Sequence, residues 1–257
     1  MITDTELDFR LDDFEPADDA SEDAERRIWV GDMTVLSEHH TAPNGSHSYL
    51  VVHDGSATWG VPGAPQLIAI KIARDFNDQT YTFETAQHAS LAFAQNWLVE
   101  QGCPRESVGQ VGPEFMKPAD LLTVRVEQRV RDSGARYKVL DSSTSDSDPA
   151  ETWTMASDSQ ASALPVRVFL EDADFGTQTY TLREGAFADE HAAQDWLDTR
   201  DGPLPQPPEY RGDASARRAH VALARSSGLA LDPKTIATPA VAPTPAATQL
   251  RVPRRSM

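Results

Sequence analysis

Four histidines lie close together in the chain, and their residue type and spacing are the best suited to metal chemistry: His39, His40, His47 and His53. The segment 41–45 between them contains a proline and a glycine, which favours a turn that folds one strand back on the next. In such a hairpin His39 would face His47 with Cβ atoms about 5 Å apart, and two imidazoles so placed can share a metal ion. His53 would lie roughly 20 Å away along its strand, and no third ligand follows. The preferred interpretation is therefore a set of polar histidines at a hairpin end.

Other motifs that carry chemistry are missing from the sequence. There is no Gly-x-Ser-x-Gly nucleophile elbow, no Gly-x-x-x-x-Gly-Lys phosphate loop and no Gly-x-Gly-x-x-Gly dinucleotide turn. A single cysteine, Cys103, excludes an intrachain disulfide and cysteine-rich zinc sites. We therefore expect a protein that is not an enzyme and that needs no cofactor. A metal- or small-molecule-dependent enzyme, with its site in a cleft between domains, remains an alternative.

The charge of the chain is divided unevenly along its length. The 257 residues carry a formal net charge of −17, from 23 Lys and Arg against 40 Asp and Glu. Residues 1–25 hold eleven acidic residues and one basic residue, whereas residues 210–257 hold two acidic and eight basic residues. An acidic surface repels nucleic acids and anionic lipids. Only the C-terminal segment therefore remains compatible with nucleic-acid binding.

Both ends of the chain are expected to be disordered. Charge repulsion and scarce apolar surface predict disorder for residues 1–25. The spaced apolar residues there could dock on a protein partner, although a solvated solubility tail is the plainer interpretation; they are Leu7, Phe9, Leu11 and Phe14. Residues 203–257 combine proline-rich stretches with a short basic helix expected at about 213–226. Weak, salt-sensitive contact with nucleic acid would use the arginines of this segment, namely Arg211, Arg217, Arg218, Arg225, Arg254 and Arg255.

An internal repeat organises the middle of the chain. Residues 75–98 align without a gap with residues 174–197 at an offset of 99, and eleven of the 24 positions are identical. Such self-similarity indicates two copies of one structural unit. Upstream the two copies agree in pattern, since Ile68, Ile70 and Ile72 alternate with other residues, as do Val166, Val168 and Leu170. Period-two alternation predicts a strand with one buried face in each copy.

Each copy reads as several antiparallel strands followed by one amphipathic helix. We expect each to open with a hairpin, at residues 27–30 in the first copy and 124–130 in the second. The closing helices are predicted at about 85–101 and 185–200, each ended by glycine and proline. The sequence thus predicts an α+β protein with two tandem sheet-plus-helix modules at residues 26–103 and 121–202. A linker over residues 104–120 would join them.

The functional expectation is a non-enzymatic interaction or regulatory protein with a duplicated module and tails that dock a protein partner. Duplicated modules without convergent polar residues are typical of binding surfaces. No apolar run approaches the roughly 20 residues of a membrane span, and the N-terminus lacks a signal-peptide pattern. A cytoplasmic protein without membrane contact is expected.

Overall fold

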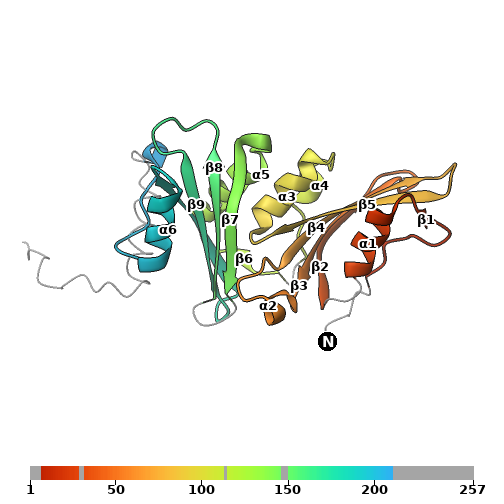
Figure 1. Ribbon diagram of the computed structural model, residues 1–257, viewed down its shortest axis with the longest axis horizontal. Helices are drawn as coiled ribbons and strands as arrows, with labels where there is room; N and C mark the ends of the chain where they lie inside the picture. Colours follow the sequence, from red (N-terminus) through yellow and green to blue (C-terminus); the bar gives the residue numbers. More distant parts are fainter. Residues whose placement is uncertain (1–6, 29–31, 113–114, 146–149, 211–257) are drawn as a thin grey trace, which may run out of the picture.

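The computed structural model describes residues 7–28, 32–112, 115–145 and 150–210. Within these ranges the protein has an α+β fold with two five-stranded sheets in tandem, each mixed but mostly antiparallel and each accompanied by helices (Figure 1). The predicted C-terminal helix at about 213–226 lies outside the described residues.

The first copy contains one complete sheet and its helices. Its elements are β1 (Glu15–Pro16), α1 (Asp19–Ile28), β2 (Met33–His40), β3 (His47–Asp54), α2 (Ala57–Gly60), β4 (Leu67–Asp75), β5 (Thr80–His88), α3 (Leu91–Glu100) and α4 (Arg105–Val108). The second copy repeats the order of the strands, with a helix after the first strand and another after the last. Its elements are β6 (Lys117–Pro118), α5 (Leu121–Arg131), the 3-10 turn η1 (Gly134–Arg136), β7 (Tyr137–Ser145), β8 (Glu151–Asp158), β9 (Val166–Asp174), β10 (Thr179–Phe187), α6 (Glu190–Thr199) and the 3-10 turn η2 (Pro208–Tyr210).

The two sheets have the same topology. The strand orders are β1-β5-β4-β3-β2 and β6-β10-β9-β8-β7, so four strands follow one another as an antiparallel meander. The short first strand of each copy pairs in parallel with the last strand of the meander. Even a register shift recurs, between Val35 and Ser37 in β2 and between Val139 and Asp141 in β7. The duplication predicted from sequence is therefore a duplication of the whole fold.

Each copy opens with a strand and a helix, which corrects the expected hairpin at residues 124–130. Of the hairpin expected at residues 27–30, residues 27 and 28 belong to α1 and the others lie outside the described residues. Residues 124–130 lie inside α5, whose buried Leu122, Val126 and Val130 recur every four residues along one face. The Asp120 side chain caps this helix by accepting a hydrogen bond from the Thr123 amide at 2.9 Å. The valines at alternate positions favour a strand, whereas the four-residue spacing of Leu122, Val126 and Val130 favours a helix. The side chains at the four-residue spacing are the buried ones. The segment expected as a linker, residues 104–120, likewise contains α4 and β6.

The opening helices dock on their sheets through the same contacts. The Ser21 hydroxyl accepts a hydrogen bond from the Phe83 amide of β5 at 3.1 Å. The Thr123 hydroxyl does so from the Leu182 amide of β10 at 3.2 Å. In both copies a helix carboxylate also accepts a hydrogen bond from the hydroxyl of a strand tyrosine, in the pairs Tyr81–Glu25 and Tyr180–Glu127. The structural repeat thus extends upstream of the aligned residues 75–98 and 174–197. The opening helices differ in sequence, but the same hydroxyl and carboxylate groups make their hydrogen bonds to the sheet.

Residues 7–25 belong to the folded part of the chain, which corrects the prediction of a disordered acidic tail for these residues. Phe9 is 3% exposed and meets the Phe83 ring edge-on at 5.1 Å between centroids. Leu7, Leu11 and Phe14 are partly buried against the same core. Arg74 of β4 holds the segment by donating from Nε to the Arg10 carbonyl at 3.1 Å. The apolar residues bury their side chains on the same face of the first sheet that α1 covers.

Helix α3 joins the two copies into one core. It covers one face of the first sheet through Leu91, Ala94 and Leu98. Its opposite side reaches the second sheet, where Phe93 packs edge-on against Phe169 at 5.1 Å between ring centroids. Figure 1 accordingly shows, from left to right, α6, the second sheet, α5 with α3, the first sheet and α1. The copies therefore pack together, a point that the repeat pattern left open.

No helix in the described part of the chain is long and apolar enough to cross a membrane.

Candidate functional site: an arginine-lined hollow above a buried ion network

The two copies differ most sharply on the sheet face that α1 covers in one and α5 in the other. Ile72 pairs with Phe83, and Glu171 pairs with Leu182, so the strands correspond at the offset of 99. Ile68, Ile70 and Ile72 of β4 therefore correspond to Arg167, Phe169 and Glu171 of β9. The sequence comparison had matched the isoleucines to Val166, Val168 and Leu170 instead. A shift of one residue moves every side chain to the other face, and both faces of these strands are buried.

Arg167 is the centre of a buried ion network. Its side chain is 1% exposed, and three carboxylates surround it. Its Nε donates to Asp158 Oδ2 at 3.2 Å, and its Nη2 donates to Glu209 Oε1 at 2.8 Å. Its Nη1 lies 3.5 Å from Glu184 Oε1. A buried guanidinium without such partners would be very costly, so the network is a condition for placing arginine where the first copy has isoleucine.

Asp158 connects this network to Arg136 of η1. Arg136 holds the carboxylate by two parallel bonds, from Nε to Oδ1 at 2.8 Å and from Nη2 to Oδ2 at 2.7 Å. Burial by itself would raise the pKa of Asp158. The hydrogen bonds and positive charges of Arg136 and Arg167 outweigh burial and hold this pKa below its usual value. Asp158 therefore remains ionised and fixes the plane of the Arg136 guanidinium.

Glu184 connects the network to Arg129 of α5 and to the end of the described chain. Arg129 Nη1 and the Tyr210 hydroxyl both donate to Glu184 Oε2 at 2.7 Å. The Arg129 guanidinium also lies over the Tyr210 ring, 4.6 Å from its centroid. Burial, together with the nearby Glu184 charge, raises the pKa of Tyr210, so its hydroxyl stays a donor. Segment 208–210 thus contributes Glu209 and Tyr210 to the network.

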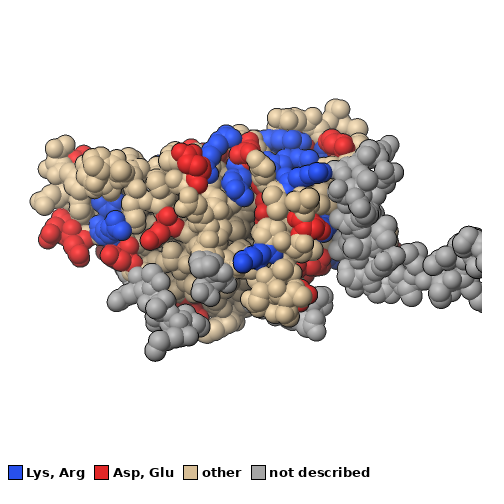
Figure 2. Space-filling view, turned by 180° about the vertical axis from the view of Figure 1, so that it is seen from behind, with Lys and Arg blue, Asp and Glu red and all other residues tan. Residues whose placement is uncertain are grey.

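Two of these arginines reach a hollow at the molecular surface. The hollow measures about 500 Å³ and is lined by residues of α5, of η1 and of the loop after β8, namely Arg125, Gln128, Arg129, Asp132, Ser133, Arg136 and Gln160. We call it the arginine hollow. Its acidic member, Asp132, is paired with Arg105 at 3.1 Å. In Figure 2 Lys and Arg side chains lie in the upper part of the face drawn there, with Asp and Glu side chains beside them. The hollow thus gathers three arginines on a chain of net charge −17, and two of them, Arg129 and Arg136, pair with Glu184 and Asp158.

The first copy positions one wall of the arginine hollow. Asn96 of α3 donates from Nδ2 to the Gly134 carbonyl at 3.1 Å and accepts from the Gly134 amide at 2.9 Å. Gly134 begins η1, the turn that ends at Arg136. The Arg136 guanidinium lies over the Tyr137 ring, 4.8 Å from its centroid. Helix α3 thereby fixes the turn, and the site depends on both copies.

The histidine hairpin has a different register from the predicted one. Tyr49, and not His47, lies opposite His39 across the ladder. Both imidazoles stack on the Tyr49 ring, with centroids 6.3 Å away for His39 and 6.2 Å for His47. The two imidazoles therefore do not face each other across the ladder as the predicted metal pair requires. Within the described residues, no group of three or more His, Cys, Asp or Glu side chains could hold a metal ion.

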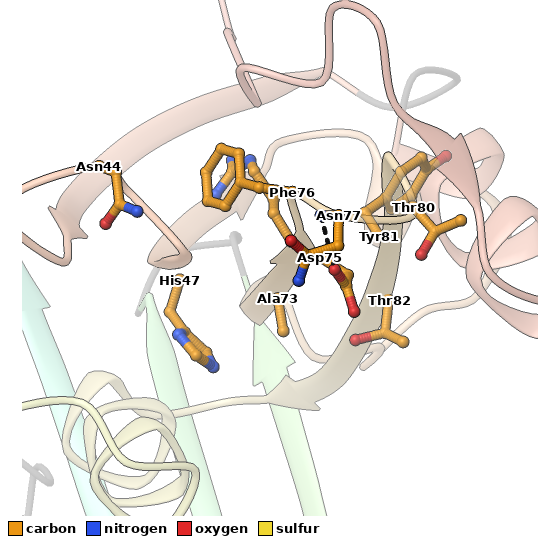
Figure 3. A pocket seen from close by; sticks show the side chains of 10 residues that line it. Asn44, His47, Ala73, Asp75, Phe76, Asn77, Thr80, Tyr81 and Thr82 are labelled. Atoms are coloured by element: carbon orange, nitrogen blue, oxygen red, sulfur yellow. Dashed lines mark hydrogen bonds between the residues drawn. The ribbon is translucent and has the colours of Figure 1, made fainter.

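A second hollow, of about 590 Å³, lies beside this hairpin. In Figure 3 His47 points into it from β3, and Asp75 lies across from it at the end of β4. Asp75 accepts hydrogen bonds from the amides of Asn77 at 2.8 Å and Asp78 at 3.3 Å. Asp174 does the same in the second copy, with the amides of Gly176 and Thr177. Turn geometry therefore explains both aspartates without a ligand.

The remaining predicted site residues separate into two groups. Phe9 is buried inside the chain, and Leu7, Leu11 and Phe14 pack partly buried on the first sheet, so these surfaces are already occupied. The predicted nucleic-acid residues lie outside the described residues; they are Arg211, Arg217, Arg218, Arg225, Arg254 and Arg255. Between the copies, where a catalytic cleft was the alternative, Phe93, Tyr137 and Phe169 form an apolar core.

The arginines of the hollow were missed by sequence reasoning, although a signal existed. Aligning β4 with β9 at the offset of 99 replaces Ile68 by Arg167 and Ile72 by Glu171. Aligning α1 with α5 through Ser21 and Thr123 sets Arg125 opposite Asp23. The second copy thus has charged residues where the first has isoleucine, and an arginine where the first has aspartate.

The chain matches no known protein family, no curated protein and no solved structure.

Proposed function

We propose that this is a non-enzymatic binding protein whose second copy recognises an acidic protein partner at the arginine hollow. The observation that carries the proposal is the difference between the copies. One fold is built twice, once with Ile68, Ile70 and Ile72 on the sheet face and once with Arg167, Phe169 and Glu171. Since the apolar version forms the same sheet, the fold itself does not require the charges.

The charge of the site supports an acidic partner. Arg125 and Arg129 lie one helical turn apart on α5, and Arg136 lines the same hollow. Like charges at this helical spacing destabilise a helix by a few tenths of a kcal/mol, and an anionic ligand relieves that repulsion. Arginine is also the cation that binds carboxylate-type groups best, because its donors form a planar fork.

The chemistry of the site supports binding and not catalysis. The described network holds its carboxylates in ion pairs, as Asp158 is with Arg136 and Arg167. A general base needs a carboxylate or imidazole that is free to take a proton near neutral pH. In contrast, Asp158 has a lowered pKa and two cationic partners.

The test is binding of a fluorescein-labelled peptide of ten glutamates, followed by fluorescence anisotropy at low salt. We expect binding that weakens as salt rises and a loss of about tenfold or more in the Arg125→Glu variant. Arg26→Glu is the matched control, because Arg26 is exposed on α1 of the first copy and the change in charge is the same. Equal affinity of the two variants would overturn the proposal.

Weak nucleic-acid association through the C-terminal arginines is a second proposal, supported by the eight basic residues of segment 210–257. Deleting residues 211–257 should abolish a DNA gel shift at low salt. A shift that persists after the deletion, or no shift with the intact chain, would reject it.

A further inference from the structure

The arrangement of donors in the arginine hollow also indicates which anionic group fits. Three arginines line it from separate backbone positions, two from α5 and one from η1. A carboxylate has two oxygens and a single negative charge, and one arginine fork matches both oxygens. A phosphate monoester has three terminal oxygens and a charge close to −2 at neutral pH. It can therefore accept bonds from three arginines together.

Two of the three arginines, Arg129 and Arg136, are held in place before any ligand arrives. Asp158 takes the Nε and Nη2 donors of Arg136, and a guanidinium has five N–H donors in all. Glu184 and Tyr210 are bonded to Arg129 through its Nη1 atom. Each guanidinium also rests on a tyrosine ring, Arg136 on Tyr137 and Arg129 on Tyr210. Preorganised donors lose little conformational freedom on binding, which favours tight capture of a small anion.

The neutral lining suits the same group. Gln128 and Gln160 line the hollow and offer side-chain amide donors. The Ser133 hydroxyl beside them donates to the Val130 carbonyl at 2.6 Å. The acidic residue Asp132 is paired with Arg105 at 3.1 Å, which offsets its charge. With about 500 Å³ and an opening to solvent, the hollow has room for a phosphate that is still attached to a peptide.

We propose that the arginine hollow binds a phosphate monoester carried by a serine or threonine of the acidic protein partner. This inference rests on the proposed function, because it names the group that the partner presents at that same site. Phosphorylation of the partner would then control whether the two proteins associate.

The experiment compares three labelled peptides of one acidic sequence that carry serine, phosphoserine or glutamate at the centre. We expect the phosphoserine peptide to bind the full chain at least about tenfold more tightly than the other two, a difference of about 1.4 kcal/mol. Arg125→Gln should remove this preference, whereas Arg26→Gln on α1 should leave it intact. Arg129→Lys keeps the charge but loses the fork, so we expect it to reduce the preference.

The outcomes separate the inference from the proposed function. If glutamate and phosphoserine peptides bind equally and both are lost in Arg125→Gln, the phosphate inference is wrong and the acidic-partner proposal stands. If none of the peptides binds, both fail. Inorganic phosphate serves as a competitor. If inorganic phosphate binds as tightly as the phosphopeptide, the hollow is a site for free phosphate. That result would reject the proposal that the phosphate is carried by a partner protein. Thermal unfolding of each variant checks that the fold is kept.

Discussion

Arg167 and Asp158 form an ion pair inside the second copy, with 3.1 Å between Nη2 and Oδ2 and side chains that are 1% and 0% exposed. The first copy has Ile68 at the position of Arg167 and packs that face with apolar side chains. A buried ion pair is weak evidence of stability, because desolvation offsets much of the attraction. The role we assign to this pair is to position Arg136, since Asp158 also holds the Arg136 guanidinium at the arginine hollow.

The Arg167–Asp158 pair should show strong energetic coupling. Arg167→Met and Asp158→Asn each leave a buried charge short of a partner, and we expect each to lower the free energy of unfolding by about 3 kcal/mol or more. The double variant should lose less than the sum, with a coupling energy of about 1–3 kcal/mol. Urea unfolding of the four proteins measures this cycle. Additive losses would show that the two side chains do not interact.

Asn96 should support the arginine hollow from the first copy. Replacing it with alanine removes both hydrogen bonds to Gly134, which we expect to cost about 1–2 kcal/mol of stability. Because Gly134 begins the turn that carries Arg136, peptide binding at the hollow should weaken as well. Gln194→Ala on the exposed side of α6 is the control, since its bond to Asp198 is at the surface. A variant that loses stability but binds the acidic peptide normally would refute the positioning role.

The pH dependence of stability should reveal Glu171. Burial, followed by the charges of Glu127 and Asp172, raises the pKa of Glu171 from 4.5 to about 8. The folded protein then binds a proton that the unfolded chain has lost, so this group lowers stability as pH rises from about 4.5 to 8. Glu171→Gln should remove that decline and stabilise the protein at pH 8 by roughly 1 kcal/mol or more. Parallel stability–pH curves for the two proteins would contradict the assignment.

Phe9 tests the order of the acidic N-terminal segment. Its ring is buried against Phe83, so Phe9→Ala should cost about 3–5 kcal/mol through lost contacts and a cavity. Val61→Ala is the comparison, because that side chain is 63% exposed and should change stability by less than about 0.5 kcal/mol. If Phe9→Ala were equally neutral, the segment would be detached from the core in solution.

The metal hypothesis for His39 and His47 has a direct check. Since Tyr49 lies opposite His39 in the sheet, we expect purified protein to contain much less than one equivalent of zinc. Added zinc should then leave the thermal stability of the His39→Ala variant unchanged. A stoichiometric metal content that is lost in this variant would restore the metal site.

The amino-acid sequence alone was enough to predict the duplication and the α+β class. Identical residues at a fixed offset repeat the same local hydrogen bonds, as Asp75 and Asp174 do. Local patterns also placed β4 and β9 by their alternation, and β2 and β3 by the turn between them, because both signals depend on neighbouring residues. They were less decisive for α5, where β-branched valines suit a strand and a four-residue spacing suits a helix.

Which strand faces correspond, and what covers them, depends on long-range packing. Both faces of β4 and β9 are buried, so alternation alone could not fix the register of the two copies. Phe9 is a core residue because it packs with α1 on the same face of the first sheet. The arginine hollow required α3, α5, η1 and segment 208–210 to meet, and long-range packing brings these segments together. Charges that look dispersed along the chain thereby become a buried network with one basic opening.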